Sequence, residues 1–85
     1  MIKIYTAQWC PYCQSAKKLL AEKKYQFIEV DIEKEGISRD ALAEKTGAAS
    51  VPQIIINDIP IGGYTELVAL TQSGKLSKMM TPDQS

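Results

Sequence analysis

The segment MIKIYTAQWCPYC, residues 1–13, carries the only two cysteines of the chain at its end. Residues 1–6 alternate β-forming side chains and predict a first strand, whereas residues 14–24 have the apolar spacing of a helix. Cys10 therefore falls where the strand gives way to the helix. Cys13 lies on the apolar stripe of that helix, so we expect it to be the more buried thiol.

The start of a helix favours a thiolate. Backbone N–H groups without helical partners and the positive end of the helix dipole both stabilise a negative charge there. Pro11, at the first helical position, gives up only an N–H that would have no partner. Three lysines and no acidic residue occur before Glu22, so nearby side chains act in the same direction. We interpret Cys10 as a nucleophile.

Composition limits the alternatives. Eighty-five residues with 45% apolar content suffice for one compact domain, residues 1–85, with one core. Ten basic and ten acidic residues cancel, which gives no indication of a nucleic-acid partner. No apolar run approaches the roughly 20 residues that span a bilayer, and the strand-like start does not resemble a signal peptide. We expect a cytoplasmic monomer without membrane contact.

The cysteine pair is better explained by redox chemistry than by structure. A disulfide across two intervening residues closes too small a loop to stabilise a chain much, and structural disulfides are rare in reducing compartments. Structural zinc needs four ligands, and two cysteines without any histidine supply half of them. We therefore predict no metal site.

Residues 26–32 alternate between apolar and acidic side chains. Ile28, Val30 and Ile32 share one face, which predicts a strand with that face buried. A strand, a helix and a second strand in this order predict a parallel pair with a right-handed crossover.

Turn and capping residues divide the rest of the chain into further elements. Ser38 caps a helix that ends near Gly47, and residues 53–57 and 59–62 form a hairpin. Pro60 makes the second strand of this hairpin an edge strand. A helix over residues 65–72 ends at Gly74, and the tail has a short helical turn and frays from about residue 81.

Four motifs occur in an order that identifies a resemblance. They are Tyr5-Thr6, Cys10-Pro11-Tyr12-Cys13, Val51-Pro52-Gln53-Ile54 and the run from Ile61 to Leu67, IGGYTEL. With these motifs the chain resembles the glutaredoxins of the dithiol CPYC type, over residues 1 to about 80. The resemblance implies an α/β, thioredoxin-like fold with a four-stranded mixed sheet flanked by three or more helices.

The resemblance also implies an activity, that of a glutathione-dependent thiol–disulfide oxidoreductase. Cys10 would attack protein disulfides and glutathione mixed disulfides, and Cys13 would resolve the intermediate. Glutathione would be a reducing co-substrate, with no cofactor bound permanently. The partners would be disulfide-containing or glutathionylated proteins.

A glutathione groove follows from the same resemblance. Its residues are Tyr12, Arg39, Val51, Pro52, Gly63, Tyr64, Thr65 and Glu66. Pro52 would be cis and the Val51 backbone would pair with the cysteinyl unit. The γ-glutamyl carboxylate would bind at Tyr64 and Thr65, and Glu66 would accept from the ammonium group. Ala7 stands where the family usually has a basic residue, so Arg39 is the expected partner of the glycyl carboxylate.

Two alternative functions differ in chemistry. A glutathione-ligated iron–sulfur cluster carrier is disfavoured by Pro11, because cluster-binding relatives tend to have glycine or serine there. A glutaredoxin-like electron donor reduced by thioredoxin reductase is disfavoured because the glutathione motifs are present. Trp9, beside Cys10, fits a binding surface and simple packing equally well.

Overall fold

A computed structural model of the protein describes residues 1–79. The predicted fraying from about residue 81 lies outside these residues. The elements follow one another as β1 (Ile2–Thr6), α1 (Pro11–Glu22), β2 (Ile28–Asp31), α2 (Arg39–Thr46), β3 (Gln53–Ile56), β4 (Ile59–Gly62), α3 (Tyr64–Ser73) and α4 (Lys75–Met79).

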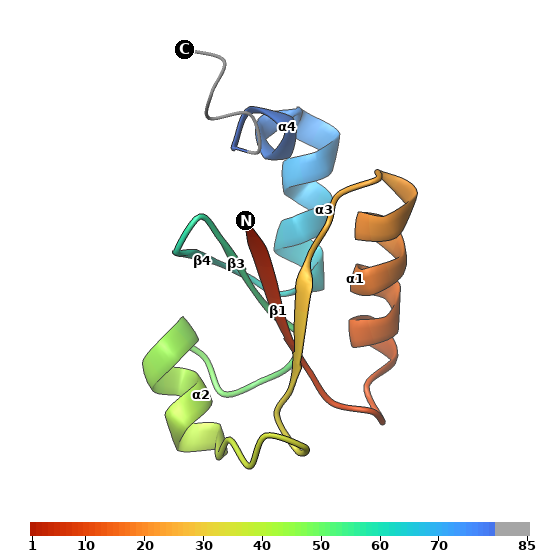
Figure 1. The fold of residues 1–85 in the computed structure, drawn as a ribbon. Coiled ribbons are helices and arrows are strands. Elements are labelled where there is room, and N and C mark those ends of the chain that lie inside the picture. Colours follow the sequence, from red (N-terminus) through yellow and green to blue (C-terminus); the bar gives the residue numbers. More distant parts are fainter. Residues whose placement is uncertain (80–85) are drawn as a thin grey trace.

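The four strands form one mixed sheet in the order β2-β1-β3-β4 (Figure 1). β1 pairs in parallel with β2 and antiparallel with β3, and β3 pairs antiparallel with β4. The predicted parallel pair, the hairpin and the edge position of the strand that contains Pro60 are all confirmed. Asn57 and Asp58 both have positive φ angles, 51° and 69°, as a two-residue hairpin turn of type I′ requires.

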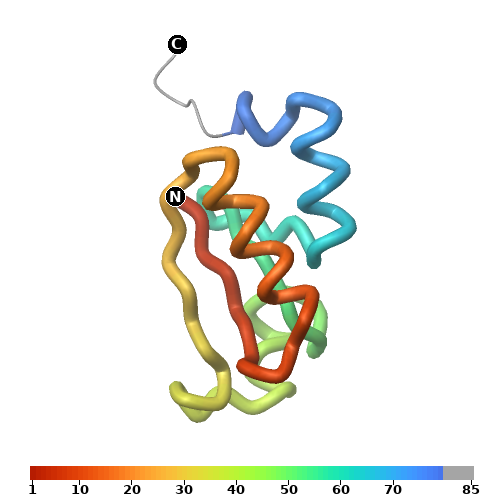
Figure 2. The backbone as a smooth tube through the Cα atoms, turned by 90° about the vertical axis from the view of Figure 1, so that its right-hand side faces the viewer, coloured from red at the N-terminus to blue at the C-terminus, as the bar shows by residue number. Residues whose placement is uncertain are grey.

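Helices cover both faces of the sheet. α1 and α3 lie on one face, and α2 lies on the other (Figure 1). Figure 2 shows α1 running alongside β1. A first core cluster joins β1 and β3 to α1, α3 and α4 through Ile4, Leu20, Ile54, Leu67 and Leu76, all at most 1% exposed. These contacts hold β1 and α1 in a fixed relation.

A second cluster lies where the carboxyl end of β1 meets α2 and the first turn of α1. Its buried members are Tyr5, Ala7, Cys10, Cys13, Ile32 and Leu42. Both thiols therefore belong to a packed core rather than to a surface loop. This packing fixes their positions relative to the sheet.

The expected burial of one face of β2 is wrong in part. Ile32 is buried and Val30 packs against the second cluster, but Ile28 is 45% exposed. β2 is an edge strand, and of its two apolar residues Val30 packs against the cluster that contains Leu42 of α2, whereas Ile28 does not. The alternation of apolar and acidic residues correctly separates the two faces of β2, but it does not show how much of the apolar face other elements cover.

Helix ends follow local chemistry. Ser38 caps α2 by accepting a hydrogen bond from the Ala41 N–H at 3.1 Å, as predicted, and Gly47 ends it in a left-handed conformation. α1 ends at Glu22, two residues earlier than predicted. Lys24 has a positive φ of 64°, which no helical residue adopts.

The two isoleucines Ile54 and Ile28 provide a matched test of this core. Ile54→Ala should lower the free energy of unfolding by about 2–5 kcal/mol, because it opens a cavity in a fully buried site. Ile28→Ala should cost about 1 kcal/mol or less, because that side chain already contacts water. Urea unfolding followed by circular dichroism measures both. Equal losses would contradict the assigned position of β2.

Candidate active site

Cys10 is the N-cap residue of α1 and uses its sulfur as the capping group. Its Sγ accepts a hydrogen bond from the Cys13 N–H at 3.1 Å. The Cys10 thiol also lies 3.6 Å from the Val51 carbonyl oxygen, to which it donates. A sulfur that carries negative charge would keep the first contact, which becomes stronger when the acceptor is ionised. The geometry agrees with the predicted nucleophile.

Cys13 occupies a different environment one turn into the helix. Its side chain is fully buried, whereas Cys10 is 3% exposed, so the predicted order of burial is confirmed. Burial raises the pKa of the Cys13 thiol to about 12, with a further increase from its hydrogen bond to Cys10. The Ala7 backbone and the charge of Lys17 act in the opposite direction and lower this pKa. At neutral pH Cys13 is a protonated thiol.

A groove of about 550 Å³ begins beside Cys10, where Tyr12 and Val51 form part of its wall. It is lined by Tyr12, Thr46, Gly47, Ala48, Ser50, Val51, Pro52, Gln53, Gly62, Gly63, Tyr64, Thr65 and Glu66. Seven of the eight residues predicted for glutathione are in this set. The rings of Tyr12 and Tyr64 lie 5.9 Å apart between centroids, which joins the dithiol loop to the start of α3.

The Val51-Pro52 bond is cis, as the resemblance implied. Pro52 is buried, and Val51 packs against the second core cluster while its carbonyl faces the Cys10 thiol. The backbone just before β3 is therefore held next to the reactive sulfur.

The Glu66 side chain caps the N-terminus of α3. The Glu66 carboxylate accepts a hydrogen bond from the Gly63 N–H at 2.7 Å through Oε1. A Cβ on Gly62 would lie 2.8 Å from the Glu66 side chain, and one on Gly63 would lie 3.1 Å from the Pro52 carbonyl oxygen. The two glycines therefore let β4, Pro52 and Glu66 approach closely.

Arg39 does not line the groove. It lies at the start of α2, and its Nη1 donates to the Ala49 carbonyl oxygen at 3.0 Å. Ala49 lies between two groove residues, Ala48 and Ser50. The guanidinium group is thus anchored to the loop of residues 48–50, which forms one rim of the groove.

Sequence reasoning missed this rim, which comprises Thr46, Gly47, Ala48, Ser50 and Gln53. The Thr46 hydroxyl lies 2.8 Å from the Leu42 carbonyl oxygen and 2.9 Å from that of Ala48, and the Gln53 amide donates to the Ser50 hydroxyl at 3.2 Å. The short small-residue run between Gly47 and Val51 is the one signal that could have shown a tight loop beside the proline.

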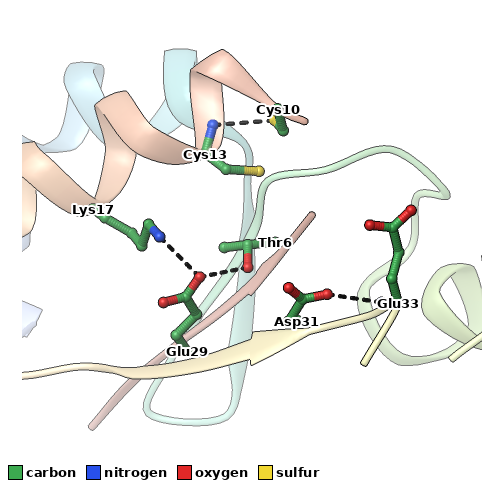
Figure 3. A network of polar contacts seen from close by, with 7 residues as sticks. All are labelled: Thr6, Cys10, Cys13, Lys17, Glu29, Asp31 and Glu33. Atoms are coloured by element: carbon green, nitrogen blue, oxygen red, sulfur yellow. Dashed lines mark hydrogen bonds and ion pairs between the residues drawn. The ribbon is translucent and has the colours of Figure 1, made fainter. Parts of the chain in front are cut away.

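A polar network lies beneath the thiols on the α1 side of the sheet (Figure 3). The Glu29 Oε2 accepts from the Thr6 hydroxyl at 2.7 Å and from the Lys17 Nζ at 2.9 Å. The hydrogen bonds from Lys17 and Thr6 lower the pKa of Glu29. This carboxylate therefore stays ionised at neutral pH and keeps Lys17 in place.

Trp9 is 58% exposed beside Cys10, and its indole N–H lies 3.3 Å from the Glu33 carboxylate. Its ring is therefore not a core side chain. Among residues 1–79, no group of three or more metal-binding side chains occurs, and no helix has the length and apolar character needed to cross a membrane.

Comparisons with known proteins agree with this geometry. The Glutaredoxin family profile matches residues 2–61. A glutaredoxin of Pseudomonas aeruginosa is 41% identical over 80 residues, which cover 94% of this chain and 95% of that protein. Glutaredoxin 3 of Escherichia coli K12 is 38% identical, with 93% and 95% coverage.

Among solved structures, the buckwheat glutaredoxin–glutathione complex superposes with a TM-score of 0.85 at 26% identity, covering 94% of this chain and 76% of that one. The expected thioredoxin-like architecture is confirmed. With its fold, its paired thiols and its family match over most of its length, this chain belongs to the glutaredoxin family.

Proposed function

We propose that this chain is a glutathione-dependent thiol–disulfide oxidoreductase in which Cys10 is the nucleophile and Cys13 the resolving thiol. One observation supports this assignment above the others. Cys10 caps α1 at the end of a groove, and Cys13 lies buried and protonated one helical turn further on. Two chemically different thiols in contact suit two successive steps.

In the first step the Cys10 thiolate attacks one sulfur of a disulfide. A bond forms between the two sulfurs, the original disulfide breaks, and the second sulfur leaves with the electron pair and takes a proton from water. The Cys13 N–H lies 3.1 Å from Cys10 Sγ and would donate to the sulfur as it attacks.

The second step depends on the substrate. With a glutathionylated protein, Cys10 carries the glutathione and a second glutathione removes it as glutathione disulfide. With a protein disulfide, Cys13 attacks Cys10 Sγ, the client leaves as a thiol, and two glutathione molecules then reduce the Cys10–Cys13 disulfide. Cys13 is needed only in the second case.

The groove would hold the cysteinyl and γ-glutamyl parts of glutathione. The Val51 backbone would pair with the cysteinyl unit and bring its sulfur to Cys10. The N–H groups of Tyr64 and Thr65, in the first turn of α3, would bind the γ-glutamyl carboxylate. The Thr65 hydroxyl would add a donor, and Glu66 would accept from the ammonium group while it retains its bond to Gly63.

The proposal extends to the domain organisation, the oligomeric state, the compartment and the client proteins. We infer a single domain over residues 1–85 that acts as a monomer in the cytoplasm, where free thiols persist. Its clients would be proteins with disulfides or glutathionylated cysteines, and it would hold no permanent cofactor. Both cysteines are unpaired in the structure, as expected for a reduced protein ready to react.

Single cysteine variants separate the two steps. Cys10→Ser should reduce turnover of both a glutathionylated substrate and a protein disulfide to the uncatalysed background. Cys13→Ser should keep the first activity and lose the second. NADPH consumption with glutathione and glutathione reductase measures both, and a parallel assay with thioredoxin reductase alone is the control. Full deglutathionylation by Cys10→Ser would overturn the assignment.

Arg39→Met should weaken glutathione capture without changing the thiol chemistry. Loss of one exposed charge-assisted hydrogen bond, about 1 kcal/mol, should raise the KM for glutathione about fivefold and leave kcat unchanged. Lys45→Met is the matched control, because it removes a positive charge from the last turn of the same helix, at the opposite end from Arg39. Thermal unfolding of both variants shows whether losing the Arg39–Ala49 hydrogen bond destabilises the fold. If Arg39→Met and Lys45→Met have the same KM for glutathione, Arg39 is not part of the binding site.

A further inference from the structure

The resolving step requires a thiolate that the core disfavours. Burial raises the pKa of the Cys13 thiol, so at neutral pH only a small fraction of molecules carries a negative charge at this sulfur. Ring closure is slowed in proportion to that fraction. A group that stabilises the Cys13 thiolate would therefore raise the rate of ring closure.

Lys17 is placed to do so. It lies four residues after Cys13 on α1, and residues with this spacing are neighbours on one helix face. Figure 3 shows both side chains on the side of α1 that faces β1 and β2. The Lys17 side chain is only 23% exposed, so solvent screens its charge incompletely.

The ammonium group is held rather than free. Glu29 Oε2 lies 2.9 Å from Lys17 Nζ and accepts a second hydrogen bond from the buried Thr6 hydroxyl at 2.7 Å. Thr6 immediately precedes Ala7, whose backbone also lowers the pKa of Cys13. The network thus ties the cation to the strand end beneath the thiols.

The groups that act on the Cys13 thiol are Cys10, the Ala7 backbone and Lys17. Tyr5 of β1 and the apolar Leu42 of α2 belong to the same core cluster as Cys13. On β2, Glu29 binds Lys17, and the charge of Asp31 acts on Glu29. Among the described residues, Lys17 is the one cation that acts on the Cys13 thiol.

We propose that Lys17 is a positioning residue for the resolving step, which it promotes by stabilising the Cys13 thiolate, and that Glu29 and Thr6 hold it there. The proposal rests on the dithiol mechanism given above. Cys13 loses its proton to water, its sulfur attacks Cys10 Sγ, and the Cys10–Cys13 bond forms as the bond from Cys10 to the client breaks. The client sulfur leaves with the electron pair and is protonated by water, while Lys17 keeps its proton throughout.

A chromogenic aromatic disulfide in excess over the reduced protein reports both steps. The first aromatic thiol is released when Cys10 attacks, and the second when Cys13 closes the ring. Cys13→Ser identifies the first phase, because it lacks the second. Stopped-flow absorbance between pH 6 and pH 9 gives the two rates and their pH dependence separately.

Lys17→Met should slow the second phase roughly three- to tenfold across this pH range, the effect of one partly screened charge near a buried thiol. The first phase should stay within about twofold of its original rate. Lys17→Arg should restore the second phase. Lys18→Met, which removes an exposed charge from the next position, should change neither phase.

Glu29→Gln distinguishes electrostatics from simple support. The amide oxygen of glutamine can still accept from Lys17 and Thr6, so Lys17 stays in place, but the negative charge that offsets it is removed. The second phase should therefore be as fast as in the original protein or faster. Slowing of the second phase by both Lys17→Met and Glu29→Gln, or an unchanged second phase in Lys17→Met, would overturn the proposal. Loss of the first phase in the unmodified protein would instead overturn the proposed function.

Discussion

The hydrogen bond from the Cys13 N–H to the Cys10 sulfur is the interaction on which the site depends. It exists because Cys10 is the N-cap of α1, where the first backbone N–H groups have no helical partners. The same helical turn that offers an N–H to Cys10 carries the Cys13 side chain into the core. One local structure thus gives the Cys10 sulfur a backbone donor and buries the Cys13 thiol, which stays protonated.

The rest of the fold keeps that turn next to a groove. β1 leads directly into it, and pairing with β3 brings the Val51-Pro52 segment to the same end of the sheet. The Val51 carbonyl oxygen then lies 3.6 Å from the Cys10 thiol. Gly62 and Gly63 let the start of α3 approach Pro52 closely. Three segments far apart in sequence meet because the sheet order places them together.

Much of this arrangement could be predicted from the sequence. Helix caps, turn residues and alternation reflect local chemistry, so the strand order around the hairpin and the position of Cys10 followed from them. The exposure of Ile28 could not be foreseen, because it depends on how much of that face of β2 other elements cover. The loop from Thr46 to Ser50 was missed because small residues carry no chemical pattern of their own. The Lys17–Glu29 pair was missed because it joins two elements whose alignment only the structure gives.

Because Ala7 occupies the loop before Cys10, any positive charge near the thiols has to come from other elements of the chain. The Ala7 side chain is 1% exposed and packs among the thiols, so the loop before Cys10 brings no positive side chain to the site. Positive charge must come from elsewhere. Arg39 lies at the outer rim, anchored to Ala49, whereas Lys17 lies beneath the dithiol, anchored to Glu29. A single cation next to the thiols would affect both substrate capture and thiolate formation. If Arg39 serves substrate capture and Lys17 serves thiolate formation, as proposed, then glutathione affinity and ring closure can change independently.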